Sequence, residues 1–414
     1  MIQNPILQGF NPDPSICKVN QDYYVATSTF EWFPGVQIHH SRDLVNWRLV
    51  GHALQEKRLL NLQGVPSSGG VWAPALSFHD GLFYLCYTVV HQHEAATKDT
   101  PSFLLTSPSI DGPWSDPVFI NSSGFDPSLF HDDDGKKYWL NMVWDHRPGK
   151  HPFYGIVLQE FDPKAQSLVG KSKLIFKGST LGLTEGPHLY KRNGFYYLLT
   201  AEGGTEYEHA VSLARSTELA GPYEIHPQNP ILTSSGKPEL KLQKAGHASL
   251  IETKENQWYM THLCGRPLPG TNKCNLGRET AIQKVEWRDD DWLYLTNGGN
   301  EPHEQVQPPP LEPCPWDELP NPLPFDSPHF AIPRGPSSSV MIEPDGLTLV
   351  GMESLESNFE QAMLARRLTS QRLTATTKLS FQPENFQQMA GLAAYYNTYL
   401  FHYLYLSNDE ERGL

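Results

Sequence analysis

Short alternating apolar and polar segments run through most of this chain. Strand-like runs such as 23–25, 82–85 and 138–140 are rich in Tyr, Phe, Trp, Val and Leu, which suit a half-buried pleated surface. Several runs are joined by Asp-Gly or Asn-Gly pairs, such as Asp80-Gly81 and Asn193-Gly194, which supply the positive φ of a tight hairpin. No long stretch carries the 3.6-residue period of an amphipathic helix. The pattern therefore predicts an all-β protein.

One layout recurs five times within residues 1–300: an inner segment, a polar turn and an aromatic strand. The copies begin at residues 11–16, 72–76, 125–129, 185–189 and 247–250. Repeats at this kind of period are typical of propellers and solenoids. Four strands per repeat, closed into a ring, leave no long sheet edge unpaired. We therefore predict a five-bladed β-propeller over residues 1–300, with a large β-sandwich as the alternative.

Equivalent positions of the five copies should converge on one mouth, because the innermost strand of each propeller blade lines the central axis. These positions are Asp13, Ala73, Asp126, Gly186 (with Glu185 beside it) and His247. Three carboxylates and a histidine from four blades would then share one funnel. Like charges gathered in a cleft shift each other's pKa, which is a common property of functional sites.

The composition changes after residue 300. Twelve prolines lie between residues 301 and 336, and such a stretch forms neither helix nor central strand. We expect a Pro-rich linker over residues 301–325. Strand-like segments follow at 347–350, 362–367, 373–379, 389–396 and 400–406. These segments predict a second all-β domain, a partial β-sandwich, over residues 326–414.

Charge and cysteine content narrow the classes of partner and location. The net charge is -14 and no Lys/Arg run is present, which argues against nucleic acid as a partner. No apolar stretch approaches a membrane span. The five cysteines are odd in number and lack zinc-type spacing, which favours reduced thiols. The first five residues do not resemble a signal peptide, so we expect a cytoplasmic location.

The three carboxylates suit the hydrolysis of a glycosidic bond. That reaction needs a protonated acid at the leaving oxygen and a second carboxylate that activates water or attacks carbon. Asp13 and Glu185 can hold these two roles, and Asp126 could raise the pKa of the acid by repulsion. Structural alternatives exist, because Asp13 could serve a hairpin and Asp-Pro-Ser at Asp126 is a common turn former. Glu185, before Gly-Pro, has little local structural purpose.

Five motifs together carry a specific resemblance. They are Asn11-Pro12-Asp13-Pro14-Ser15, Trp72-Ala73-Pro74, Phe125-Asp126-Pro127-Ser128, Thr184-Glu185-Gly186-Pro187 and Leu276-Gly277-Arg278-Glu279-Thr280. The set resembles glycoside hydrolase family 43, especially its two-domain β-xylosidases, from residue 4 to the end of the chain. The resemblance implies a five-bladed propeller and an inverting reaction, with Asp13 as base, Glu185 as acid and Asp126 as the residue that tunes the acid. It also implies a sugar pocket lined by Phe30, Trp72, Trp144, His247 and Arg278.

Each pocket residue also has a purely structural interpretation. Trp72 could stack on a sugar or only pack, Phe30 could plug a loop, and His247 could satisfy a buried hydrogen bond. Arg278 could pair with its neighbour Glu279 or grip sugar hydroxyls. The run Asp132-Asp133-Asp134-Gly135 lacks the other ligands of a calcium loop, and we expect a solvated hairpin turn there. No cofactor is predicted, although a divalent cation near His247 stays open.

The resulting prediction is an enzyme that releases xylose from the non-reducing ends of short β-1,4-xylo-oligosaccharides. An α-L-arabinofuranosidase or arabinanase on the same fold is an alternative, as is a non-catalytic sugar-binding propeller. A retaining fructosidase-like propeller would open with Asn-Asp-Pro-Asn, which residues 11–14 do not match. The resemblance implies a complete sandwich, of which residues 326–414 supply only part. We therefore expect exposed strand edges, self-association into a homo-oligomer and a pocket that lacks one wall.

Overall fold

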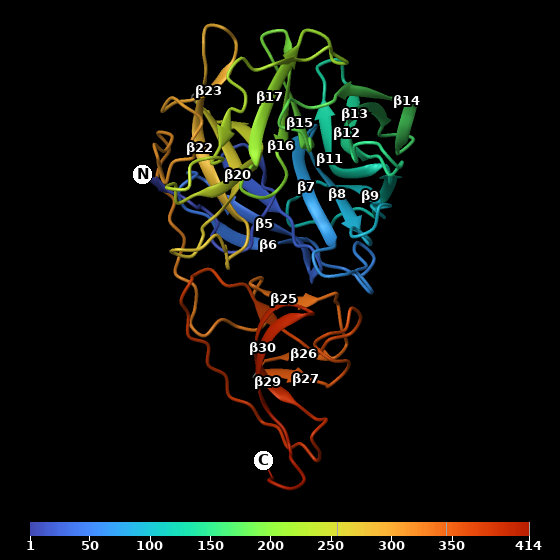
Figure 1. The fold of residues 1–414 in the computed structure, drawn as a ribbon, viewed down its shortest axis with the longest axis vertical. Coiled ribbons are helices and arrows are strands. Elements are labelled where there is room, and N and C mark those ends of the chain that lie inside the picture. Colours follow the sequence, from blue (N-terminus) through green and yellow to red (C-terminus); the bar gives the residue numbers. More distant parts are fainter. Residues whose placement is uncertain (255, 345, 414) are drawn as a thin grey trace.

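A computed structural model describes residues 1–254, 256–344 and 346–413; Leu414, the last residue of the predicted second domain, lies outside the described residues. Five β-sheets surround a common axis in the larger body, and a smaller region drawn in orange and red follows it (Figure 1). Within the described residues, no helix is long and apolar enough to cross a membrane.

The first three blades are four-stranded antiparallel sheets. Blade 1 contains β2 (Ser15–Val19), β3 (Asp22–Thr27), β5 (Gly35–Ser41) and β6 (Arg48–Leu54). Blade 2 contains β7 (Gly70–His79), β8 (Leu82–Val90), β9 (Ser102–Ser107) and β10 (Val118–Asn121). Blade 3 contains β11 (Gly124–His131), β12 (Lys137–Trp144), β13 (Phe153–Asp162) and β14 (Ser167–Phe176).

The last two blades follow the same order, with the fourth strand of blade 4 split in two. Blade 4 contains β15 (Glu185–Arg192), β16 (Phe195–Glu202), β17 (Ala210–Ser216), β18 (Glu224–Ile225) and β19 (Leu232–Thr233), and both β18 and β19 pair with β17. Blade 5 contains β20 (Gln243–Glu252), β21 (Trp258–Gly265), β22 (Glu279–Trp287) and β23 (Leu293–Leu295).

The blades close into a ring through their innermost strands and the apolar layers between them. Each of β2, β7, β11, β15 and β20 contacts the next, and β20 returns to β2. Five large hydrophobic clusters each lie between two neighbouring blades. In the cluster that closes the ring, Ile16 and Val25 of blade 1 pack with Tyr259 and Ile282 of blade 5. The predicted five-bladed propeller is confirmed, and the β-sandwich alternative for this region is wrong.

Hairpin turns occur where the sequence predicted them. The β7–β8 turn places Asp80 at φ 49° and Gly81 at φ 77°. The β15–β16 turn places Asn193 at φ 49° and Gly194 at φ 80°. Two consecutive residues with positive φ give the backbone twist that matches the flanking strands.

The two ends of the propeller chain are tied together. Strand β1 (Ile2–Gln3) pairs with β24 (Gln305–Val306), and Leu7 bridges Thr280 of blade 5. Strand β24 lies inside the segment predicted as a linker, so the first residues after blade 5 still pack on the propeller.

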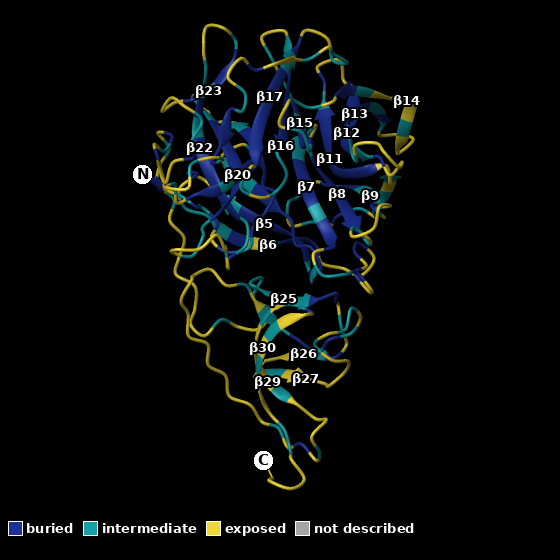
Figure 2. Ribbon diagram, in the orientation of Figure 1, coloured by how far each residue is buried: buried dark blue, intermediate teal, exposed yellow. Residues whose placement is uncertain are grey.

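The smaller region consists of short strands: β25 (Phe330–Pro333), β26 (Val340–Glu343), β27 (Gly346–Leu349), β28 (Ala365–Arg366), β29 (Ala390–Asn397) and β30 (Leu400–Leu406). Strand β25 joins it to the propeller by pairing with β4 (Trp32–Phe33), in a loop of blade 1. The strand predicted at 373–379 is wrong, because these residues form no strand. Figure 2 shows the propeller interior buried, whereas this region is mostly intermediate or exposed.

Candidate active site

The five equivalent repeat positions share an unusual backbone conformation. Asp13, Ala73, Asp126, Gly186 and His247 have φ angles of 56°, 35°, 56°, 57° and 47°. The left-handed region costs a residue with a side chain roughly 1–2 kcal/mol. Register irregularities fall at this point in β7, β11, β15 and β20, as expected where bulges re-aim side chains. The repeat seen in the sequence is therefore a repeat of backbone geometry, and the four residues of this set that carry a side chain bear its cost.

Asp13 is buried and is contacted by groups from blades 1 and 5. Ser28 Oγ donates to Asp13 Oδ2 at 2.6 Å and itself accepts from the backbone N–H of Ala73 at 2.7 Å. Arg278 Nη1 lies 3.4 Å from Asp13 Oδ1, and His247 Nδ1 lies 3.9 Å from the same oxygen. A hydroxyl and a guanidinium thus fix the orientation of this carboxylate.

Glu185 is the first residue of β15 and is also buried. Burial raises the pKa of Glu185 to about 8, while Arg278 opposes the shift and Asp13 adds to it. A carboxyl group with this pKa keeps its proton at neutral pH, as a general acid must.

Asp126 completes the cluster. Its Oδ2 accepts the backbone N–H of Gly186 at 3.0 Å. Burial raises the pKa of Asp126 well above its ordinary value, and Glu185 and then Asp13 raise it further. The structure therefore brings together all three predicted carboxylates. Their individual catalytic roles stay predictions.

The predicted aromatic residues form one continuous wall. The ring of Trp72 lies 6.1 Å from that of Phe30 and 5.4 Å from that of Phe125, and Phe125 lies 6.2 Å from Trp144. Arg278 lies over Phe30, with Cζ 5.7 Å from the ring centre. Trp72 and Phe125 immediately precede Ala73 and Asp126 in the sequence. The wall therefore adjoins the carboxylates.

Arg278 is available to this site because its neighbour has another partner. Glu279 is fully buried and accepts from Arg266 Nε at 2.6 Å and from the backbone N–H of Gly9 at 2.8 Å. The alternative in which Arg278 pairs with Glu279 is therefore wrong, and the guanidinium of Arg278 points instead to Asp13.

Sequence reasoning missed three residues that lie in this wall or beside it. Phe125 had a signal, because it precedes Asp126 as Trp72 precedes Ala73. The ring of Phe10 lies 5.3 Å from that of Phe30, and no sequence pattern pointed to it. Arg367 comes from the smaller region and lies with Cζ 4.7 Å from the ring centre of Phe10. Burial lowers the pKa of Arg367 to about 10, opposed by Glu31.

His247 packs directly over β15. A Cβ added at Gly186 would lie 3.0 Å from its ring. Burial, reinforced by His247, lowers the pKa of both His188 and His209 to about 3. Across the described ranges, no group of three or more His, Cys, Asp or Glu is arranged to hold a metal ion.

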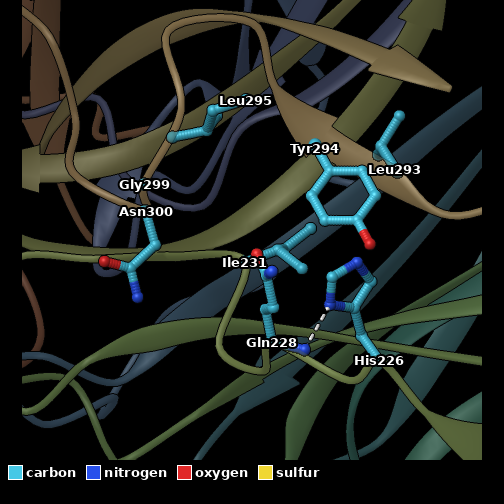
Figure 3. A pocket seen from close by; sticks show the side chains of 8 residues that line it. All are labelled: His226, Gln228, Ile231, Leu293, Tyr294, Leu295, Gly299 and Asn300. Carbon is cyan, nitrogen blue, oxygen red and sulfur yellow. Dashed lines mark hydrogen bonds between the residues drawn. The ribbon is translucent and has the colours of Figure 1, made fainter. Parts of the chain in front are cut away.

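Two further features lie away from the carboxylates. Residues 133–136 form an exposed hairpin turn, as predicted, whereas Asp132 is buried and bonded to Lys191 at 2.7 Å. A pocket of about 130 Å³ lies on blades 4 and 5, where His226 Nδ1 accepts the backbone N–H of Gln228 at 3.0 Å (Figure 3). The residues that line this pocket include no predicted site residue.

Comparison with known families accounts for nearly the whole chain. Glycosyl hydrolases family 43 matches residues 2–293. The chain belongs to glycoside hydrolase family 43. A second family, the Beta xylosidase C-terminal Concanavalin A-like domain, matches residues 325–414, which assigns the smaller region to a β-sandwich of that type.

Several family 43 proteins are similar over the full chain. Xylosidase/arabinosidase 43B of Humicola insolens is 54% identical over 433 residues, covering 100% of this chain and 78% of that protein. Beta-xylosidase of Bacillus subtilis (strain 168) is 52% identical over 429 residues, covering 100% and 80%. The crystal structure of xylan beta-1,4-xylosidase from Bacillus halodurans C-125 superposes with a TM-score of 0.96 at 54% identity, covering 100% of this chain and 80% of that one.

Proposed function

We propose that this family 43 glycoside hydrolase releases single xylose units, with inversion, from the non-reducing ends of short β-1,4-xylo-oligosaccharides. The observation that carries the proposal is a buried acid, Glu185, with its pKa raised to about 8 beside Asp13, which is paired with Arg278. The substrate class is supported by the names of the relatives, which are β-xylosidases or a xylosidase/arabinosidase.

In the proposed mechanism two proton transfers accompany one displacement. Asp13 takes a proton from a water molecule as that water attacks the anomeric carbon. Glu185 gives its proton to the glycosidic oxygen as the bond between that oxygen and the carbon breaks. The new bond forms on the opposite face, so the product has inverted configuration. Exchange with solvent then returns the proton to Glu185 and removes one from Asp13.

The remaining residues bind and orient the substrate. The wall of Phe30, Trp72 and Trp144 offers aromatic faces to the sugar ring, as pockets for small ligands commonly do. Arg278 provides charged N–H donors for sugar hydroxyls while it orients Asp13. His247, buried beside Asp13, completes the set of predicted pocket residues.

One alternative substrate has specific support. The Humicola insolens relative is named a xylosidase/arabinosidase, so activity on α-L-arabinofuranosides is the second candidate. Initial rates on 4-nitrophenyl β-D-xylopyranoside and 4-nitrophenyl α-L-arabinofuranoside separate the two. We expect higher kcat/KM on the xyloside, and a reversed preference would favour the arabinofuranosidase. Activity on neither would favour the non-catalytic sugar-binding alternative.

Stereochemistry tests the mechanism directly. Proton NMR during early hydrolysis of the β-xyloside should show α-xylose first, and β-xylose first would contradict inversion. Asp13→Ala should lose most activity and, with azide and an activated aryl xyloside, should form α-xylosyl azide, because azide replaces the water that Asp13 activates. A cytoplasmic location and self-association into a homo-oligomer stay predictions.

A further inference from the structure

A second buried glutamate lies directly behind the acid. In the β15–β16 ladder Glu185 pairs with Ala201, so the preceding residue, Thr184, lies beside Glu202. Thr184 Oγ1 donates to Glu202 Oε1 at 2.6 Å. The Glu202 side chain is fully buried at the end of β16. Cross-strand pairs of this kind fix one strand against the next.

Glu202 also accepts hydrogen bonds from the loop that precedes the acid in the chain. Its carboxylate accepts from Thr184 Oγ1, from both the N–H and the hydroxyl of Ser179, and from Ser212 Oγ. The approach is close, because a Cβ added at Gly178 would lie 1.9 Å from Thr184 Oγ1 and 2.8 Å from Glu202 Oε1. Hydrogen bonds to an ionised acceptor are the strong ones. The segment from Ser179 to Thr184 is thus fastened to β16 and β17 through one side chain.

The acid is held from both directions along the chain. Glu202 fixes Thr184 on its N-terminal side, and Asp126 accepts the N–H of Gly186 on its C-terminal side. Burial raises the pKa of Glu185, with Arg278 opposing the shift and Asp13 adding to it, and Glu202 is not among these causes. Glu202 contacts the acid's backbone neighbour, so its influence on Glu185 is geometric.

We propose that Glu202 is a positioning residue for proton transfer from Glu185 to the leaving oxygen. The inference rests on the proposed function, because it assigns Glu185 as the acid. A displaced acid slows the reaction most when the leaving group needs a proton. A misplacement of about 1 Å can lower a rate by roughly 100-fold. A leaving group that departs as a stable anion needs no such proton.

The test compares two substrates in Glu202→Gln. On xylobiose, whose leaving group requires protonation, kcat should fall about 10- to 100-fold. On 2,4-dinitrophenyl β-D-xyloside, kcat should fall less than about 3-fold, because only proton donation is impaired. KM should change little on either substrate, and the basic limb of the pH profile should stay in place. An equal loss on both substrates, or no loss on either, would overturn the proposal.

A second variant keeps the proposal testable if Glu202→Gln fails to fold. Thr184→Val keeps the shape and removes only the donor beside the acid, and it should show the same selective loss to a smaller extent. Thr200→Val is the matched control: Thr200 is buried two residues earlier on β16, and its hydroxyl has no partner among the described residues. It should show no selective loss; a loss equal to that of Thr184→Val would mean that any disturbance of β16 suffices, and would overturn the proposal.

Glu185→Gln separates this proposal from the proposed function. It should show the largest selective loss on xylobiose. If it does and Glu202→Gln and Thr184→Val do not, Glu202 has no positioning role and the assignment of the acid stands. If Glu185→Gln loses both substrates equally, the assignment of the acid fails, and the positioning role of Glu202 fails with it.

Discussion

Gly186 donates its backbone N–H to the carboxylate of Asp126 at 3.0 Å, which ties the residue after the acid to blade 3. Burial and then Glu185 raise the pKa of Asp126. Repulsion between two buried carboxyl groups acts on both, so their titrations are coupled. Asp126 can therefore influence the acid in two ways, by holding its backbone and by making its ionisation more costly.

Asp126→Asn should move the basic limb of the kcat/KM profile to lower pH. The acid works only while protonated, and the pKa of about 8 for Glu185 sets the pH above which activity declines. Because the two carboxyl groups titrate as a coupled pair, replacing Asp126 with a side chain that cannot ionise should lower that pKa, so Glu185 loses its proton earlier as the pH rises. The side-chain oxygen of the asparagine can still accept the hydrogen bond from the backbone N–H of Gly186. Rates on xylobiose across pH 5–10 check the shift, and full activity with an unchanged limb would reduce Asp126 to a turn residue.

Repetition in the sequence located most of the site because it reflects a repeated backbone. Asp13, Asp126 and His247 occupy the left-handed position of their blades, and motif alignment finds that position without a structure. Glu185 stands one residue earlier, at the position held by Trp72 and Phe125 in blades 2 and 3. The acid thus occupies in blade 4 the repeat position that carries an aromatic ring in blades 2 and 3.

Contacts made by segments outside the repeat leave no pattern in the sequence from which they could be predicted. Phe10 and Arg367 reach the wall from a loop and from the smaller region, and neither belongs to a repeat. Glu202 gains its role only through the loop that folds back onto it. The predicted strand at 373–379 failed for a related reason, since strand propensity depends on a partner that sequence alone does not identify.

Gly246→Ala should destabilise the protein by about 2 kcal/mol, the usual cost of overpacking a core. An added Cβ would lie 1.9 Å from Cδ2 of the fully buried His209, and close-packed interiors yield little. Chemical denaturation measures the loss. Gly351→Ala, where the added Cβ meets open space, is the control.

A double variant identifies the cause of that loss. In His209→Ala/Gly246→Ala, the shorter side chain makes room for the added methyl group. The combined loss should therefore be smaller than the sum of the two single losses. Strictly additive losses would show that the clash with His209 is not the source of the instability.

His52→Gln should reduce the amount by which the free energy of unfolding falls at acidic pH. Burial lowers the pKa of His52 to about 3, aided by Arg367 and His329, and His39 beside it is similarly depressed. The folded pKa lies below the unfolded value of about 6.5, so this contribution is complete above pH ~6.5 and declines as the pH falls toward 3. Each such group adds a slope of about 1.4 kcal/mol per pH unit. Urea unfolding at pH 7, 6, 5 and 4 should show the smaller slope in the variant; identical slopes would contradict the assignment.

The β29–β30 hairpin should drive self-association of the chain. Leu392 and Leu404 face each other across the ladder, and Leu404 and Leu406 are 78% and 47% exposed in a region that Figure 2 shows largely uncovered. Apolar surface and strand edges of this kind attract further copies. Leu404→Lys/Leu406→Lys should raise the monomer fraction in sedimentation velocity at micromolar concentration. Phe119→Lys, which changes a 58% exposed ring on the outer strand of blade 2, should not. A wild-type chain that is monomeric throughout, or an equal effect of Phe119→Lys, would show that this hairpin is not the contact.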